Sequence, residues 1–353
     1  MVMTGKNRAI VYSEFGDAGV LRETERDIVE PGPGEVRVRV VVSGVNPTDW
    51  KTRSGATAMA PMADEGQVPN QDGAGVIDAV GPGVTGLRTG DRVWLIMAAY
   101  QRPASGTAQE YTVVPADRAV PLPDGVGFEA GASLGVPAMT AHRALTVHEG
   151  APPRLAPGAL AGLNVLVAGG AGAVGNAAIQ LAVWAGATVA ATVSGPEKAD
   201  LARRAGAHHV VNYRDEDAAA QLRSAVPAGI DVVVEVAAAH NAELNLSVLR
   251  PGGTIAIYAN DSSGGPLAVD VRRNMVLNAR YQFVLLYTVP RPALAGAATA
   301  VNAALTDGAL RFGPEAGIPL HEYPLAATAA AHAAVESGTV GKVLIRVADS
   351  RNE

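Results

Sequence analysis

The chain has 353 residues, of which 48% are apolar and 18% charged, enough for about two domains with full cores and too apolar for a disordered or coiled-coil protein. The 34 acidic residues against 28 basic ones give a formal net charge of −6, and no run of Lys and Arg exceeds two residues, so we expect no nucleic-acid partner. Cysteine is absent, which excludes disulfides, thiolate nucleophiles and iron–sulfur clusters.

The first third of the chain has the pattern of a β-sheet. Residues 1–11 contain no long apolar run, so we expect no signal peptide, no membrane anchor and a soluble, cytoplasmic protein. After the Pro-Gly turn signal at 31–34, residues 35–42 begin with alternating polar and apolar side chains, as in a half-buried strand. Three short runs predict further strands, at 75–80, 92–97 and 111–114. From residue 8 to about 120 we therefore predict an antiparallel, partly open β-barrel.

The middle of the chain predicts a parallel sheet. A helix is expected over 130–145, and residues 151–162 read as a surface loop. Strands and helices then alternate, with strands at 164–168, 188–193, 210–212, 231–236 and 253–258 and helices at 174–185 and 196–205. Such alternation is typical of an α/β, doubly wound parallel sheet of the Rossmann type.

The last part of the chain returns to the β-rich domain. Two helices are predicted, at 293–306 and 325–337, and a strand at 341–347. We therefore predict a Rossmann-type domain over 139–288, inserted into a β-rich domain made of 1–138 and 289–353.

A glycine-rich turn follows the strand at 164–168. Gly169, Gly172 and Gly175 have the spacing G-x-x-G-x-x-G, a variant of the dinucleotide fingerprint. In that fingerprint the glycines make the turn, admit the pyrophosphate and bring helix and strand together, while the start of the helix attracts phosphate. A plain tight turn is the alternative in so glycine-rich a chain.

The end of the next strand predicts the cofactor. An NAD site usually has an acidic residue there, but this strand ends at Ser194, and the first carboxylate is Glu197. Ser194 and Lys198 supply the hydroxyl and the cation that a 2′-phosphate needs. The alternative is a helix cap with solvated basic residues. NADPH (NADP+) is the predicted cofactor.

Several motifs, in order along nearly the whole chain, resemble one family. They are residues 44–49 (GVNPTD), 73–77 (GAGVI), 90–93 (GDRV), 137–141 (PAMTA), 169–175, 180–182 (QLA), 212–214 (NYR) and 341–343 (GKV). The chain resembles the zinc-free quinone oxidoreductases of the zeta-crystallin type, in the medium-chain dehydrogenase/reductase superfamily. The resemblance implies a GroES-like fold for the β-rich domain, a Rossmann-type cofactor domain and a homodimer.

The zinc alcohol dehydrogenases of this superfamily have Cys where Asn46 stands and His-Glu where Gln71-Asp72 stand. Three oxygen-bearing side chains without a thiolate or imidazole are a poor zinc site, so no metal site is expected. The histidines at 142, 148, 208 and 209 have no metal-ligand spacing, and we expect them to lie on the surface or in the core.

The resemblance also implies roles for single residues. Asn46 would hold the nicotinamide edge, Thr140 would lie near the nicotinamide ribose and phosphates, and Lys342 would come close to the cofactor. The main chain at Ala173 and Val174 would contact the pyrophosphate, and Ser194, Lys198 and Tyr213 would surround the 2′-phosphate. Three alternatives stay open: Asn46 as a turn former before Pro47, Tyr213 as ordinary packing, and Asp49 as a cap of the following turn.

The predicted reaction is hydride transfer to a quinone or another conjugated carbonyl acceptor. It requires no nucleophile, and no residue is assigned as catalytic. Candidate pocket residues are Trp50, Met97, Tyr100, Phe283 and Tyr287, each of which would serve equally well as core.

Two other functions remain open. An NADPH-dependent C=C reductase, acting on enoyl thioesters or 2-alkenals, would need a proton donor, which related enoyl reductases are thought to take from a Tyr shortly after the Asn-Pro motif. Residues 50–69 contain no Tyr. The second alternative is not an enzyme: the chain would be an NADPH-binding redox sensor or structural protein with little turnover.

A strand over 282–287 at a sheet edge would provide the contact of the expected homodimer.

Overall fold

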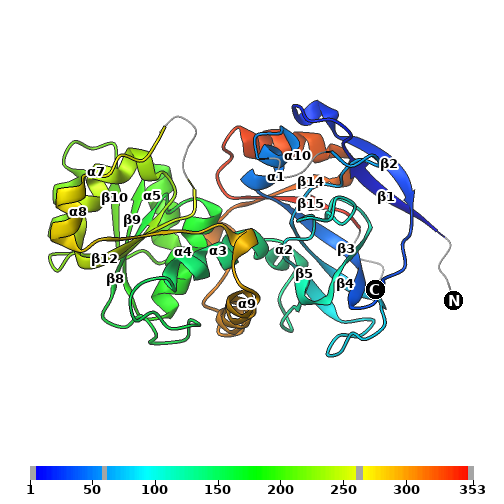
Figure 1. Cartoon of the computed structure of the whole chain (residues 1–353), viewed down its shortest axis with the longest axis horizontal. Helices are drawn as coiled ribbons and strands as arrows, with labels where there is room; N and C mark the ends of the chain where they lie inside the picture. Colours follow the sequence, from blue (N-terminus) through cyan, green and yellow to red (C-terminus); the bar gives the residue numbers. More distant parts are fainter. Residues whose placement is uncertain (1–4, 58–61, 260–264, 349–353) are drawn as a thin grey trace. The chain divides into compact units, whose positions relative to one another are not determined.

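The computed structural model describes residues 5–57, 62–259 and 265–348 and divides into two compact units (Figure 1). The first unit comprises Met1–Val136 and Leu320–Glu353, and the second comprises Pro137–Pro319. The second unit is therefore inserted into the first, as the sequence predicts. The chain returns to the first unit at Leu320, later than the predicted residue 289.

The second unit is built on a parallel sheet of six strands in the order β10-β9-β8-β11-β12-β13. All five neighbouring pairs are parallel. The strands are β8 (Asn164–Ala168), β9 (Thr188–Val193), β10 (His209–Asn212), β11 (Ile230–Glu235), β12 (Leu249–Ile257) and β13 (Arg280–Phe283). The strand order reverses between β8 and β11, which is the point where doubly wound sheets bind their ligands.

Helices cover the inner strands β8, β9 and β11 of this sheet, which are almost wholly buried. All six residues of β11 are buried, and valines and isoleucines dominate β8, β11 and the core cluster around them. The helices of the unit are α3 (Gly135–Leu145, which starts just before the unit boundary), α4 (Ala173–Trp184), α5 (Pro196–Arg204), α6 (Ala218–Ala225), α7 (Ala238–Val248), α8 (Val271–Leu277) and α9 (Arg291–Thr306). This confirms the Rossmann-type prediction.

Residues 289–319 pack on the second unit through α9 and the segment that follows it. Helix α9 buries small residues at helical spacing, among them Ala297, Val301 and Ala304. The side-chain amide of Gln180 in α4 donates to the carbonyl of Arg311 at 3.0 Å and accepts from its N–H at 2.9 Å. These contacts explain why the chain leaves the second unit only after residue 319.

The first unit contains a sheet in the order β14-β15-β3-β4-β5-β7, with β6 also paired to β3. The strands are β3 (Glu35–Val45), β4 (Asp72–Val80), β5 (Arg92–Leu95), β6 (Tyr111–Pro115), β7 (Ala119–Pro121), β14 (Leu320–Pro324) and β15 (Lys342–Arg346). Its pairs are antiparallel except β14–β15. The helices are α1 (Pro47–Arg53), α2 (Phe128–Gly131) and α10 (Thr328–Glu336). β15 thus returns to the central strand β3, in agreement with the predicted fold.

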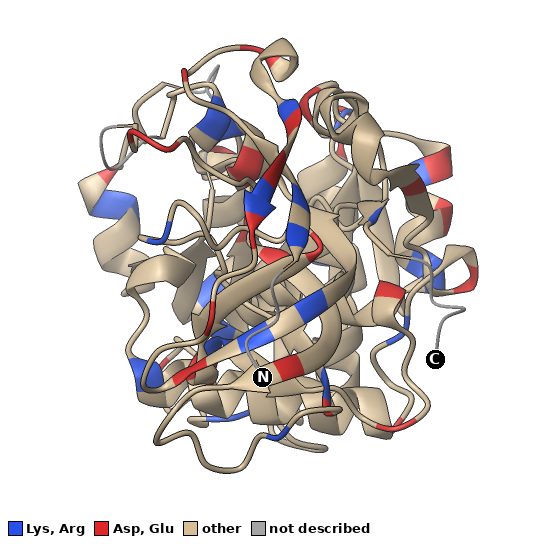
Figure 2. Ribbon diagram, turned by 90° about the vertical axis from the view of Figure 1, so that its right-hand side faces the viewer, with Lys and Arg blue, Asp and Glu red and all other residues tan. Residues whose placement is uncertain are grey.

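A separate two-stranded ribbon, β1 (Lys6–Val11) and β2 (Arg22–Asp27), completes the first unit. Basic and acidic positions are interspersed along the strands that face the viewer in Figure 2. Lys6 pairs with Asp27 at 2.7 Å, and Arg8 pairs with Glu110 at 2.8 Å. β2 is charged or polar at every position, so its sequence does not have the pattern of a strand.

The helix predicted over 130–145 is two helices, α2 and α3. Pro137 has no N–H to donate and its ring favours the first turn of a helix, so a new helix begins at Gly135. Residues 151–162 form a loop, as predicted, in which Leu155 and Leu160 are buried. No helix in the described part of the chain is both long and apolar enough to cross a membrane.

Candidate cofactor and active site

The glycine turn after β8 has the geometry that the dinucleotide fingerprint requires. Gly169 has φ of 68°, a left-handed conformation that favours glycine. A Cβ on Gly175 would lie 2.3 Å from the carbonyl oxygen of Gly169, so only glycine lets α4 start this close to the turn. A Cβ on Gly172 would meet only that oxygen, at 3.4 Å. Ala173 and Val174 are the first two residues of α4, where backbone N–H groups are available to an anion.

The predicted 2′-phosphate residues lie at the carboxyl ends of β9 and β10. Ser194 directly follows β9, and Lys198 lies in the first turn of α5. Tyr213 follows β10, donates its backbone N–H to the carbonyl of Val193 at 3.0 Å and is 45% exposed. Because neighbouring parallel strands end at the same edge, the structure brings these three residues to one place.

The alternative assignments at this edge agree less well with the structure. The N-cap of α5 is Gly195, not Ser194, and it makes no side-chain cap. The half-exposed Tyr213 ring is not packed between helix and sheet. Within the described residues, the side chains of Ser194 and Lys198 make no hydrogen bond or ion pair. They are therefore available to a ligand.

In the first unit, Asn46 and Lys342 meet in a buried polar cluster. The Lys342 ammonium donates to Asn46 Oδ1 at 2.7 Å and lies 3.5 Å from Asp72 Oδ2. Asn46 Nδ2 donates to the same Asp72 oxygen at 2.7 Å. The side chains of Lys342 and Asp72 are 1% and 0% exposed. The resemblance implies that both Asn46 and Lys342 serve the cofactor, and the structure places them in direct contact with each other.

Two carboxylates of this cluster hold the backbone around it. Asn46 is the N-cap of α1, and its N–H donates to Asp49 Oδ2 at 2.7 Å, so Asp49 does cap the turn. Asp49 Oδ1 accepts from the N–H of Gln71 at 3.1 Å, and Asp72 Oδ1 accepts from the N–H of Val136 at 2.8 Å. Asn46 thus does form the turn before Pro47, while its side chain is engaged elsewhere.

Burial shifts the pKa of each ionisable group in the cluster. It raises the pKa of the Asp49 carboxyl to about 8, and the charge of Asp72 adds to the rise. Burial also raises the pKa of Asp72 and lowers that of Lys342, while the attraction between the two groups opposes both shifts. Charged groups this deep in a protein persist only when they are paired, as Lys342 and Asp72 are.

The residues at the zinc-ligand positions of the related alcohol dehydrogenases do not fit zinc. Asn46, Gln71 and Asp72 offer oxygen and amide groups, whereas zinc prefers thiolate and imidazole. The Lys342 ammonium also lies among them, so a cation is already present. Within the described residues, no group of three or more His, Cys, Asp and Glu side chains could hold a metal ion.

The remaining candidate residues are spread over both units. Thr140 is buried in α3. In the first unit, Trp50 in α1 and Tyr100 after β5 are half-buried, and Met97 is buried. In the second unit, Phe283 is exposed at the end of β13 and Tyr287 is half-buried in a short turn. Their role in a substrate pocket stays a prediction.

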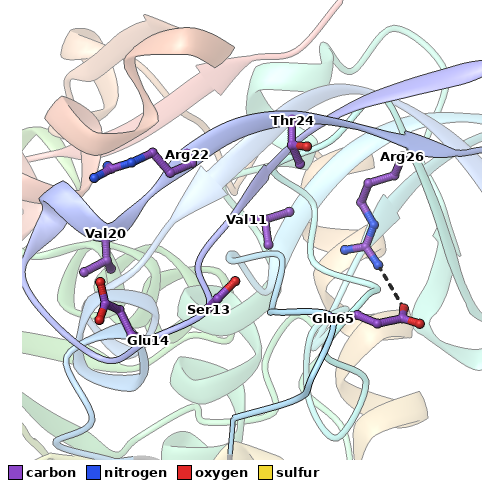
Figure 3. Close-up of a pocket in the computed structure, with 8 residues that line it drawn as sticks. All are labelled: Val11, Ser13, Glu14, Val20, Arg22, Thr24, Arg26 and Glu65. Atoms are coloured by element: carbon purple, nitrogen blue, oxygen red, sulfur yellow. Dashed lines mark ion pairs between the residues drawn. The ribbon is translucent and has the colours of Figure 1, made fainter.

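None of these residues lines a hollow of about 700 Å³ on the first unit (Figure 3). Its lining includes Arg22, Thr24 and Arg26 from β2, and Arg26 faces Glu65 across it at 3.7 Å. It holds two basic and two acidic side chains. This balance of charge favours no single class of ligand.

Sequence reasoning missed one residue at the sheet reversal. Glu235 is fully buried at the end of β11 and accepts from the N–H of Ala237 at 2.6 Å. It also accepts from the side chains of Asn241 and Asn245, at 2.9 and 2.6 Å. These bonds fix the start of α7 next to the glycine turn, because β11 is the neighbour of β8. The only signal in the sequence is a lone acidic residue that closes an apolar run.

The comparisons with known proteins agree with this arrangement. The GroES-like domain of alcohol dehydrogenases matches residues 32–124, and the family described as zinc-binding dehydrogenase matches residues 173–301. The quinone oxidoreductase of Lama guanicoe is 34% identical over 343 residues, which cover 96% of this chain and 97% of that protein. The chain belongs to the quinone oxidoreductase family.

Other members of this group share the fold along its whole length. A solved mycobacterial protein complexed with NADPH, 30% identical, superposes with a TM-score of 0.79 over 96% of this chain and 99% of that one. The Escherichia coli quinone oxidoreductase complexed with NADPH, 26% identical, has a TM-score of 0.78 over the same shares.

A 2-haloacrylate reductase of Burkholderia is also similar in sequence. It is 31% identical over 257 residues, 72% of this chain and 73% of that protein.

Proposed function

We propose that this protein is an NADPH-dependent quinone reductase that works without zinc. The observation that supports it best is the edge formed by β9 and β10, where Ser194, Lys198 and Tyr213 gather and where Ser194, not an acidic residue, directly follows β9. These three side chains suit a 2′-phosphate because none of them carries a negative charge that would repel it. An NAD site, by contrast, needs an acidic residue there. Bound NADPH would supply the hydride that the quinone accepts.

The side chains and backbone of this chain would hold and orient the cofactor. We assign the pyrophosphate to the turn of Gly169, Gly172 and Gly175 and to the first N–H groups of α4, at Ala173 and Val174. Asn46 and Thr140 are assigned to the nicotinamide half. No side-chain acid is required, because a reduced quinone is stabilised by its own ring and takes protons from water.

A second candidate function is reduction of an activated C=C bond. The similarity to a 2-haloacrylate reductase favours it. That reaction leaves a carbanion beside a carbonyl, and the carbon must be protonated. Residues 50–69, where a Tyr would be expected, contain none.

The test is NADPH oxidation followed at 340 nm with 1,4-benzoquinone, 9,10-phenanthrenequinone, crotonyl-CoA and 2-hexenal in parallel. EDTA is present throughout, and NADH is the matched control. We expect turnover of the quinones, a strong preference for NADPH and no effect of EDTA. Preferential turnover of crotonyl-CoA or hexenal would instead establish the C=C reductase, and tight NADPH binding without turnover would indicate a sensor.

We also propose that the protein is a homodimer that pairs through β13. This strand ends the six-stranded sheet, and within the described residues no strand pairs with its outer edge. The large apolar side chains exposed on it and beside it are between 47% and 72% exposed: Val269, Val271, Met275, Val276, Phe283 and Leu285. Exposed apolar groups at an unpaired edge are typical of a contact with a second copy.

The cytoplasmic location of the protein stays a prediction.

The double variant Met275→Lys/Phe283→Lys tests the dimer. Two added charges on this face should convert the protein to a monomer, because a pair of lysines would have to lose water in the contact. Light scattering or native mass spectrometry measures the mass of the variant in solution. The exposed Val29 of the first unit, changed to Lys, is the matched control and should leave the mass unchanged. A wild-type monomer at micromolar concentration would contradict the proposal.

A further inference from the structure

The Lys342 ammonium is buried although lysine is among the side chains least often buried. The sheet itself brings it there, because β15 runs antiparallel to β3 and pairs Val343 with Val45. The same register places Lys342 opposite Asn46. Gly44 makes room for it, since a Cβ there would lie 3.1 Å from Lys342 Cε and 2.1 Å from the Ala132 carbonyl oxygen. The contact is thus part of the fold and not a chance position of a long side chain.

The partners of Asn46 fix which way its amide points. An ammonium only donates hydrogen bonds and an ionised carboxylate only accepts them. Lys342 must therefore face Asn46 Oδ1, and Asp72 must face Asn46 Nδ2, as the structure has them. A flipped amide would set its NH2 group against the ammonium and its oxygen against the carboxylate. Lys342 and Asp72 together permit one orientation only.

We propose that Lys342 is an internal cation in place of the zinc of the related alcohol dehydrogenases, and that with Asp72 it orients Asn46 toward the nicotinamide. This inference rests on the proposed function, in which Asn46 serves the nicotinamide half. Lys342 is then a positioning residue that acts through Asn46, and it does not bind the cofactor itself. The Lys342 ammonium, acting as this internal cation, explains both the buried ion pair and the poor fit of the cluster to zinc.

The charge balance of the cluster provides a discriminating experiment. Lys342→Met leaves Asp72 buried and uncompensated, and Asp72→Asn does the same to Lys342, so each single variant should lose thermal stability. The double variant Lys342→Met/Asp72→Asn is neutral at both positions and should recover much of that stability. It no longer has an ammonium and a carboxylate to hold the amide of Asn46.

Binding of NADPH is compared with binding of adenosine 2′,5′-bisphosphate, which has only the adenosine half. For the double variant we expect the Kd of NADPH to rise on the order of tenfold, the scale of one hydrogen bond, and kcat to fall at saturating NADPH. The Kd of the bisphosphate should stay at the wild-type value. A double variant that regains wild-type stability, NADPH affinity and kcat would show that the pair is only structural and would overturn the inference.

A second measurement does not depend on the variants folding. In a crystal structure of the wild-type protein with NADPH, the Lys342 ammonium should remain on Asn46 and Asp72. An ammonium turned to a phosphate or ribose oxygen of the cofactor would overturn the inference and leave the proposed function intact. Failure of the wild-type protein to bind NADPH at all would contradict the proposed function itself, so the two failures are distinguishable.

Discussion

At the scale of single residues, the choice between the two nicotinamide cofactors depends on the side chains after β9. Ser194 and Lys198 have no partner among the residues that the structure describes, so a phosphate would displace no ion pair seen there. Tyr213 is held at the same edge by its backbone bond to Val193. An anion there gains a charge-assisted contact at little cost in reorganisation.

Lys198→Ala should weaken NADPH binding by about 1–3 kcal/mol, because a charge-assisted contact to the 2′-phosphate is lost. NADH, which lacks that phosphate, should bind almost as before. Titration of intrinsic fluorescence with each cofactor measures both. Arg203→Ala, in the last turn of the same helix, is the matched control and should change neither value. Equal losses for both cofactors would refute the assignment.

At the scale of elements, the glycines in the turn from β8 into α4 have two different roles, one in packing and one in cofactor binding. Gly175 is needed for packing, because its position lies against the backbone of Gly169. A Cβ on Gly172 would make one ordinary contact, 3.4 Å from the Gly169 oxygen, so this position has space for a methyl group. That space suits the approach of a ligand to the main chain.

Substitution by alanine should therefore have a different effect at Gly175 and at Gly172. Gly175→Ala should lower the free energy of unfolding by about 1–3 kcal/mol, since backbone atoms must move to admit the methyl group. Gly172→Ala should unfold at nearly the wild-type temperature but bind NADPH on the order of tenfold more weakly. Thermal unfolding and a binding titration of both variants decide it. Two variants with the same pattern of losses would contradict this division of roles.

The same scale shows which elements can be predicted from the sequence. β8 and β9 have the predicted bounds, because each is an apolar run closed by glycine or a polar residue. β2 is charged or polar at every position, so it lacks the hydrophobic pattern of a strand, and the strand expected over 282–287 is instead Arg280–Phe283. Asn46 and Lys342 were each found from family motifs. Their contact joins residues 296 positions apart, and only the register of β3 with β15 creates it.

At the scale of the whole molecule, stability should depend on pH through buried histidines. His142 accepts the N–H of Leu155 at 3.2 Å with its Nε2. Burial lowers the pKa of His142 to about 4 from 6.5. A neutral ring is favoured in the folded state, so its contribution is complete above pH 6.5 and is lost as the pH falls from 6.5 through 4.

Between pH 7 and pH 4 the folded state should lose about 3 kcal/mol relative to the unfolded state through His142. His142→Leu should be less stable at pH 7, because the Leu155 N–H loses its acceptor, but should lose less stability on acidification. Urea unfolding at both pH values measures the difference. An unchanged dependence in His142→Leu would contradict the assignment.

The insertion of one unit into the other has a consequence for synthesis on the ribosome. The second unit is one continuous stretch of chain, so its parallel sheet can form as soon as it has emerged. The central strand β3 is made early, but its partner β15 follows only after the whole second unit. Until then residues 42–45 of β3 lack this partner strand, and the Asp72 carboxylate lacks the ammonium of Lys342. The part of the first unit that is translated first can therefore complete its sheet only last.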